Sequence, residues 1–220
     1  MPSRFDLPDP RSARGDVVAV GGDLSPGTVL QAYRKGMFPM ELEDGHLGWW
    51  CPIDRAVLPL DGMQVSRSLR QSTRRFTVTV DRDFDGVIAA CATPDREGSW
   101  ISGEFVEAYT ELHRLGWAHS VEVWDIDEAL VGGLYGISIG GLFAGESMFH
   151  HLRDASKVAL VHIMVVMNGR GGSLLDIQWL TPHLASLGGM VVGRDRYLED
   201  LSDALKLPGP FSGSWSDSKS

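Results

Sequence analysis

The segment Gly172-Ser173-Leu174-Leu175-Asp176-Ile177-Gln178-Trp179-Leu180 places two polar side chains in an otherwise apolar run. A glycine cluster precedes it and Thr181-Pro182 follows it, which is typical of a short strand. Side chains two positions apart in a strand share one face, so we expect Asp176 and Gln178 to point the same way. The spacing alone favours the outward face of an edge strand. The alternative is a polar pair that faces a cleft.

The distribution of charge along the chain is uneven. The 220 residues carry a net charge of −9, and the length allows one or two domains. Residues 1–75 hold ten Lys or Arg and nine Asp or Glu, whereas residues 76–220 hold ten and twenty. The first part is therefore near +1 and the second near −10. This asymmetry argues against bulk affinity for nucleic acid but allows a local anionic partner.

Several features predict a cytoplasmic protein without a membrane segment. Cys51 and Cys91 lie far apart, which argues against a disulfide framework or a zinc site. The first six residues contain no apolar run, and the uncharged stretch 129–145 is shorter than a membrane helix needs. The seven histidines, including the adjacent pair His150-His151, form no convincing metal site. We expect no metal and no cofactor.

Hydrophobic periodicity predicts a regular succession of elements from residue 76 onward. The expected strands are 76–80, 117–124, 129–139, 142–149, the Asp176 strand and 190–192, and the expected helices are 83–91, 103–115, 154–168, 183–187 and 195–205. Before them we expect a helix from Ser25 to about Lys35, a loop over 37–40, and a short helix over 66–73. We predict a small N-terminal α/β domain over 1–62, a second domain over 63–207, and a flexible tail over 208–220.

The order β-α-α-β-β-β-α-β-α-β is that of the acetyltransferase-like (GNAT) superfamily, so we expect an α/β (α+β) fold of this type. Members that use acetyl-coenzyme A carry an R/Q-x-x-G-x-G/A phosphate cradle. The corresponding junction, His150 to Ala155, contains no glycine, and no Arg or Gln elsewhere begins such a motif. An acyl donor held by a pyrophosphate loop is therefore not expected.

A local basic face precedes these elements. Arg67, Arg70 and Arg74 recur at spacings that place them on one side of a helix, Arg75 follows, and no acidic residue lies between Ser66 and Arg75. One interpretation is a solvated charged face, and the other is a contact for a phosphate backbone. The residues alone do not favour either.

Nine segments in family order resemble the leucyl/phenylalanyl-tRNA–protein transferases. They cover most of residues 17–193 and are 20–26, 36–39, 49–52, 54–58, 100–101, 119–124, 142–149, 176–178 and 185–188. The resemblance implies transfer of Leu, Phe or Met from aminoacyl-tRNA to the N-terminal Lys or Arg of a protein, which marks that protein for degradation by the N-end rule. It implies no metal or coenzyme, and we expect a monomer.

The chemistry of this reaction fits an Asp-x-Gln pair. An α-amine attacks an activated ester, and with a pKa near 7.7–8.0 about a tenth or more of the amine is neutral at pH 7. Positioning can then supply much of the acceleration without a strong base. The resemblance implies that Gln178 contacts the attacking amine, and that Asp176 orients Gln178 and draws positive charge from the amine.

The resemblance also assigns substrate-binding residues. Glu146 would hold the aminoacyl-adenosine end or the basic acceptor side chain, Phe143 would lie near the acyl pocket, and Trp100 would stack on the terminal adenine. The four arginines would contact the acceptor stem. The chain departs from the family pattern in three places. Met40 replaces a tryptophan, Ile163 and Met167 stand where some relatives carry aromatics and could line the acyl pocket, and Thr181-Pro182 replaces a more polar turn.

Three alternatives remain open at the level of sequence. The first is a coenzyme A-dependent N-acetyltransferase on the same fold, which the missing cradle disfavours. The second is a non-catalytic tRNA-binding module that uses the arginine face. The third is a transferase of the same type that recognises an acidic acceptor N-terminus, which the acidic charge balance disfavours.

Overall fold

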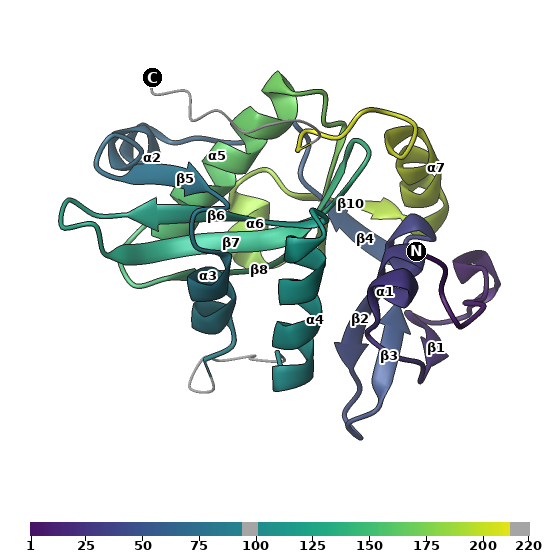
Figure 1. The fold of residues 1–220 in the computed structure, drawn as a ribbon. Coiled ribbons are helices and arrows are strands. Elements are labelled where there is room, and N and C mark those ends of the chain that lie inside the picture. Colours follow the sequence, from purple (N-terminus) through teal and green to yellow (C-terminus); the bar gives the residue numbers. More distant parts are fainter. Residues whose placement is uncertain (94–100, 212–220) are drawn as a thin grey trace.

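The computed structural model of the protein describes residues 1–93 and 101–211, and a seven-stranded mixed sheet dominates it (Figure 1). β8 and β9 are parallel, and every other neighbouring pair is antiparallel. The strand order across this sheet is β10 (Met190–Gly193), β4 (Asp54–Val57), β9 (Leu174–Gln178), β8 (Leu142–His150), β7 (Leu130–Ile139), β6 (Ala118–Trp124) and β5 (Thr77–Val80).

Helices cover both faces of this sheet (Figure 1). α5 (Ala155–Gly169) packs on one face, and α2 (Arg67–Ser72) packs on α5. α3 (Phe84–Cys91) and α4 (Gly103–Arg114) cover the opposite face. Their apolar stripes explain the arrangement, because Phe84, Val87, Ile88 and Cys91 of α3 are all buried in the core of that face.

A three-stranded antiparallel sheet stands beside α4. Its order is β1 (Val17–Val20), β3 (Leu47–Trp50) and β2 (Phe38–Glu41), with α1 (Pro26–Arg34) packed on β2 and a 3-10 turn at Pro10–Ser12. The remaining helices are α6 (Pro182–Ser186), between β9 and β10, and α7 (Arg194–Ala204). None of the helices in the described ranges is long and apolar enough to cross a membrane.

One buried arginine ties the N-terminal segment to α7. Arg194 is 8% exposed, and its guanidinium donates to the backbone carbonyls of Pro10, Ala13, Gly15 and Cys51. These four carbonyls accept from both Nη groups, which burial would otherwise leave without a partner. The two sheets are therefore joined by hydrogen bonds as well as by apolar packing.

The α/β fold and the predicted order of elements after residue 76 are confirmed. The expected loop over 37–40 is wrong, because Phe38–Glu41 forms β2. Pro39 has no N–H to donate, but β2 lies at the edge of the three-stranded sheet beside β3, where proline is tolerated. The division near residue 62 stays a prediction, although β4, which precedes it, lies within the larger sheet.

Candidate active site

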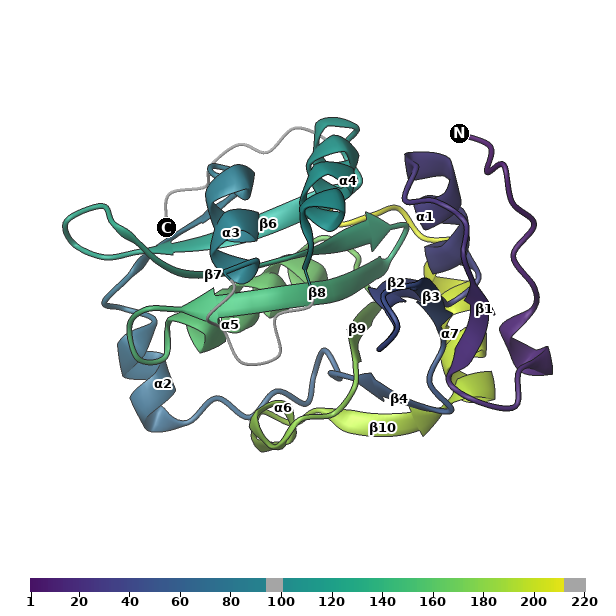
Figure 2. The same cartoon turned by 90° about the horizontal axis from the view of Figure 1, so that it is seen from below.

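The parallel strands β8 and β9 separate part-way along their length. They pair from Leu142 opposite Leu174 to Ala144 opposite Asp176, and no further. Beyond that point each strand carries a bulge: Glu146 has no partner on β7, and Ile177 has none on β4. Bulges bend a strand and re-aim its side chains. The sheet therefore opens between Glu146 and the end of β9, a region that Figure 2 shows bordered by α6.

A cavity of about 120 Å³ occupies this opening. Its walls are mainly apolar, and the polar side chains in its lining are those of Glu146, Ser147 and Gln178. The lining residues are Leu134, Gly145, Glu146, Ser147, Met148, Leu160, Ile177, Gln178 and Leu184. An apolar hollow with a few convergent polar groups is the usual form of a small-ligand site.

Gln178 has a left-handed backbone at the end of β9. Its φ is 61°, which is uncommon for a residue with a side chain and is found where the surroundings enforce it. Its amide Nε2 donates to Glu146 Oε1 at 3.1 Å, and its backbone N–H donates to Asp176 Oδ1 at 2.9 Å. Two carboxylates therefore hold the backbone and the side chain of Gln178.

Glu146 is a buried carboxyl group with a strongly shifted pKa. Burial, followed by the negative charge of Asp176, raises this pKa from 4.5 to about 7, although hydrogen bonds from Tyr33, Tyr109 and Gln178 oppose the shift. The Tyr109 hydroxyl donates to Glu146 Oε2 at 3.1 Å, and the Tyr33 hydroxyl lies 2.6 Å from that of Tyr109. Tyr33 comes from α1 and Tyr109 from α4, so both sheets contribute to the position of Glu146.

Asp176 is fully buried and paired with Arg55. Arg55 Nε donates to Oδ1 at 2.8 Å and Nη2 to Oδ2 at 2.5 Å, while the Tyr197 hydroxyl donates to Oδ2 at 2.8 Å. Burial lowers the pKa of Arg55, but the charge of Asp176, its hydrogen bonds with Arg55 and the nearby Tyr197 together outweigh burial, so the net shift is upward. With the Gln178 N–H, each carboxylate oxygen accepts two hydrogen bonds. Asp176 is therefore a fixed internal charge and does not face solvent.

The rings around Arg55 complete this buried cluster. The guanidinium lies 4.6 Å from the Phe38 ring centre and 4.4 Å from that of Tyr197. Phe38 in turn packs edge-on against Trp179. The edge-strand interpretation of the Asp-x-Gln pair is therefore wrong, because β9 lies between β4 and β8 and both polar side chains are buried.

The predicted basic face lies on α2 and in the turn that follows this helix. Arg67 and Arg70 belong to α2, Arg74 and Arg75 follow it directly, and all four side chains are exposed. Within residues 1–93 and 101–211, none of the four forms an ion pair. Their charges are available to an external anionic partner.

Comparison with known proteins identifies the family. The family model described as leucyl/phenylalanyl-tRNA protein transferase matches residues 57–202, and that of its N-terminal domain matches residues 22–53. The chain belongs to this family. The resemblance seen in the sequence is thereby confirmed, as is the aminoacyltransferase class.

Curated relatives of this transferase family match nearly the whole chain. A leucyl/phenylalanyl-tRNA–protein transferase of Ruegeria sp. (strain TM1040) is 50% identical over 86% of this chain and 90% of that protein. One of Legionella pneumophila (strain Corby) is 44% identical over 97% of each chain. Among solved structures, L-PGS from Bacillus licheniformis is 13% identical, with a TM-score of 0.41 over 74% of this chain and 55% of that one.

Three of the residues assigned by resemblance to the transferase family lie together. Asp176, Gln178 and Glu146 form one hydrogen-bonded cluster at the cavity. Their catalytic and binding roles stay predictions.

The other assigned residues are more dispersed. Phe143 is fully buried on β8, with its ring 5.7 Å from that of Phe211, and Ile163 and Met167 are fully buried on α5. The described lining of the cavity does not include them. Met40 is half-buried on β2, where its carbonyl accepts from Trp50 Nε1. Trp100 lies outside the described residues. All these roles stay predictions.

Sequence analysis missed the residues that position the cluster. Arg55 and Tyr197 hold Asp176, and Tyr109 holds Glu146. The sequence placed Tyr109 on an apolar helix stripe, where its hydroxyl carried no separate signal. A motif that contains Arg55 was part of the resemblance, but no local pattern marks a buried arginine. Among the described residues, no group of three or more His, Cys, Asp or Glu has the arrangement of a metal site.

Proposed function

We propose that this protein transfers Leu, Phe or Met from aminoacyl-tRNA to the N-terminal Lys or Arg of acceptor proteins in the cytoplasm. The product carries a new peptide bond and is marked for N-end rule degradation. Family membership and the names of the relatives, which describe a leucyl/phenylalanyl-tRNA–protein transferase, support this function.

The observation that carries the proposal is the cavity between β8 and β9. Its volume is about 120 Å³. An apolar cavity of about 150 Å³, engineered in another protein, binds benzene, so a cavity of this size suits a small apolar group. Leu134, Met148, Leu160 and Leu184 give it walls suited to an aliphatic or phenyl side chain. The ester of a bound aminoacyl group would then lie at the polar side, beside Glu146 and Gln178.

Gln178 is placed to bind the attacking amine. Its Nε2 is bound to Glu146, so its amide oxygen is the group that can accept a hydrogen bond from the amine. A left-handed backbone held by Asp176 fixes this orientation before substrate arrives. Asp176 acts as a positioning residue, since all its described contacts are with Arg55, Tyr197 and Gln178.

Glu146 is suited to manage the proton of the reaction. Attack forms the C–N bond and breaks the ester C–O bond, and one proton must pass from the amine to the departing ribose oxygen. A carboxyl group with a pKa near 7 can take up and return a proton at neutral pH. We therefore assign this relay to Glu146, in contact with Gln178.

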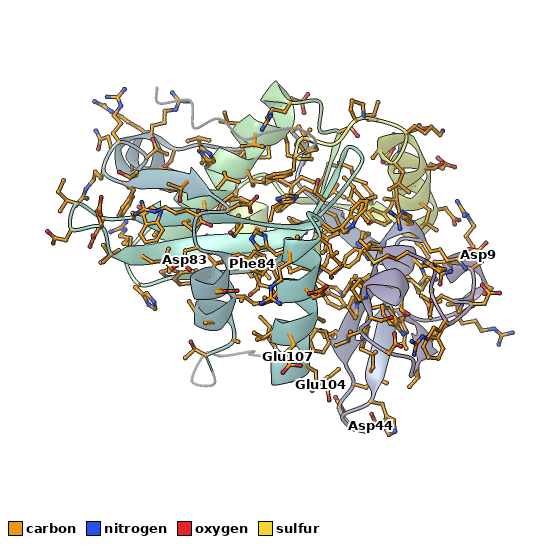
Figure 3. All side chains as sticks on the ribbon, viewed as in Figure 1. Asp9, Asp44, Asp83, Phe84, Glu104 and Glu107 are labelled. Atoms are coloured by element: carbon orange, nitrogen blue, oxygen red, sulfur yellow. The ribbon has the colours of Figure 1, made fainter. Side chains whose placement is uncertain are left out.

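Charges outside the cavity fit the two proposed substrates. The four arginines of α2 and the turn after it would bind the acceptor stem through its phosphates. Figure 3 shows three acidic side chains, Asp44, Glu104 and Glu107, toward one end of the molecule in that view. All three are exposed, which suits the approach of a cationic acceptor N-terminus.

We also propose that the protein acts as a monomer, because one chain supplies the described cavity lining, its buried cluster and the basic face. Light scattering coupled to gel filtration, at the concentration of the activity assay, tests this. A single species of 24.1 kDa is expected, and an active species that appears only at twice that mass would overturn it.

The direct test of function is transfer of labelled leucine from Leu-tRNA to peptides that begin with Arg, Asp or Ala. We expect label on the Arg peptide alone. Label on the Asp peptide would retain the chemistry but overturn the acceptor assignment. Bound tRNA with no label on any peptide would indicate a binding module instead of an enzyme.

A further inference from the structure

A second cavity adjoins the first and contains three histidines. Its volume is about 470 Å³, and it shares Met148 with the smaller cavity. The described lining residues are Ala90, Thr93, Met148, Phe149, His150, His151, Ser156 and His183. The proposed reaction uses none of the three imidazoles. His150 and His151 lie at the end of β8, whereas His183 comes from α6, so the fold brings them together from distant parts of the chain.

This histidine cavity lies between the basic helix and the reaction cavity. Ser72, the last residue of α2, donates its hydroxyl to Asp154 Oδ2 at 3.2 Å. Asp154 also pairs with Lys157 at 3.1 Å, and the neighbouring Ser156 lines the histidine cavity. At its other side the cavity reaches Met148. In Figure 2, α2, the end of β8 and α6 border the same side of the molecule.

The lining of the histidine cavity suits an unpaired nucleotide. None of the described lining residues is acidic. Burial, and to a lesser extent the positive charge of Lys157, lowers the pKa of His183 and so favours its neutral form. Imidazole rings give flat faces for base stacking and hydrogen-bonding groups for base edges.

We propose that the histidine cavity binds the penultimate nucleotides of the single-stranded 3′ end of aminoacyl-tRNA. This inference rests on the proposed function. Every tRNA ends in an unpaired CCA sequence, and its ester lies on the last adenosine. With the ester at Gln178 and the stem phosphates at α2, the two cytidines must cross the surface between them, where His150, His151 and His183 lie.

The test uses leucyl donors of increasing length: leucyl-adenosine, the leucyl esters of CA and CCA, and Leu-tRNA. The KM of the unaltered protein should fall as nucleotides are added. In the double variant His151→Ala/His183→Ala, KM for the CA, CCA and tRNA donors should rise about 5- to 150-fold, the range expected when one base stack is removed. Transfer from leucyl-adenosine should be unchanged, which also shows that the variant is folded.

Two further variants sharpen this test. His183→Phe keeps a flat ring, so it should retain much of the affinity for long donors that His183→Ala loses. His46→Ala is the matched control, because His46 is exposed in the turn between β2 and β3 and pairs only with Asp44 among the residues that the structure describes. It should match the unaltered protein on every donor.

The outcomes separate this inference from the function on which it rests. If the unaltered protein transfers leucine from no donor, the proposed function fails, and the inference with it. If transfer occurs but the double variant matches the unaltered protein on all donors, only the nucleotide subsite is overturned. An equal loss on leucyl-adenosine and Leu-tRNA would also overturn it, because the histidines would then act on the reaction cavity.

Discussion

Two arginine sites in this protein differ in what surrounds their charges. The guanidinium of Arg55 is fully buried, binds both oxygens of Asp176, and lies between two aromatic rings. The four arginines at α2 are exposed and form no ion pair with a described residue. A buried charge with a complete set of partners fixes geometry, whereas exposed charges without partners remain available to a ligand. The first site should therefore govern stability and turnover, and the second should govern tRNA affinity.

The largest expected effect comes from breaking the buried pair. Arg55→Leu removes the cation and leaves Asp176 as an uncompensated buried carboxylate, which costs about 3–5 kcal/mol in the free energy of unfolding. Urea denaturation measures this value. Arg67→Leu, at an exposed position, should change it by no more than about 0.5 kcal/mol. Equal losses in the two variants would contradict the difference drawn between the sites.

Glu146 should make stability depend on pH in a defined direction. Its folded pKa of about 7 lies above the ordinary 4.5, so the folded state retains a proton that the unfolded state loses. The favourable contribution of Glu146 to the free energy of unfolding is therefore fully present below pH 4.5 and is lost as pH rises to about 7. The loss amounts to roughly 3 kcal/mol. Glu146→Gln should gain this amount relative to the unaltered protein between pH 4.5 and 8.

Denaturation curves collected across that pH range check the prediction for Glu146. The difference in the free energy of unfolding between Glu146→Gln and the unaltered protein should level off above pH 7. At that pH the carboxyl group of the unaltered protein is ionised in both the folded and the unfolded state. A difference that does not change with pH would show that Glu146 has an ordinary pKa in the folded protein.

The size of the reaction cavity gives a prediction of intermediate effect. Leu184 is half-buried at the cavity wall, so Leu184→Phe should narrow the cavity without filling the core. Leucine and phenylalanine transfer should each fall about 10- to 200-fold in kcat/KM, the range of about 1–3 kcal/mol for pocket changes of this kind. Leu180→Phe, at an exposed position that does not line the cavity, is the control. Unchanged transfer in Leu184→Phe would place the acyl pocket elsewhere.

The smallest effect per residue is expected at the exposed arginines. Each Arg→Ala change at positions 67, 70, 74 or 75 should weaken tRNA binding. The logarithm of the association constant should also fall less steeply with the logarithm of salt concentration, by about 0.7–0.9 for each phosphate that the variant no longer neutralises. The free energy of unfolding should stay the same. Filter binding at several salt concentrations measures the slope. An unaltered slope in the fourfold variant would show that the face is merely solvated.

Local patterns in the sequence were sufficient to predict most of the fold. The order of elements followed from hydrophobic periodicity and from turn residues such as Gly140-Gly141, because these signals act over a few positions. The strand at Phe38–Glu41 was not predicted. It contains Pro39, and its place at the edge of the sheet, where proline is tolerated, is set by pairing with β3.

The candidate site was less accessible to sequence analysis. Asp176, Gln178 and Glu146 were found through motifs, but Arg55 lies 121 positions from the Asp176 that it holds. The unpaired position of Ile177 depends on the register between β9 and β4, which are distant in sequence. The meeting of His150 and His183 depends on where α6 lies relative to the end of β8. These features arise from tertiary pairing, which single-sequence periodicity does not contain.

The central claim, that the cluster around Gln178 performs transfer while the arginines bind tRNA, is best tested by kinetics of two variants with Leu-tRNA and an Arg peptide. Gln178→Ala removes the group that positions the amine, so it should lower kcat about 100-fold and leave the dissociation constant for tRNA unchanged. The variant with Arg67, Arg70, Arg74 and Arg75 all replaced by Ala should raise that constant and keep kcat at saturating tRNA. Loss of tRNA binding in Gln178→Ala, or loss of kcat in the arginine variant, would contradict the account.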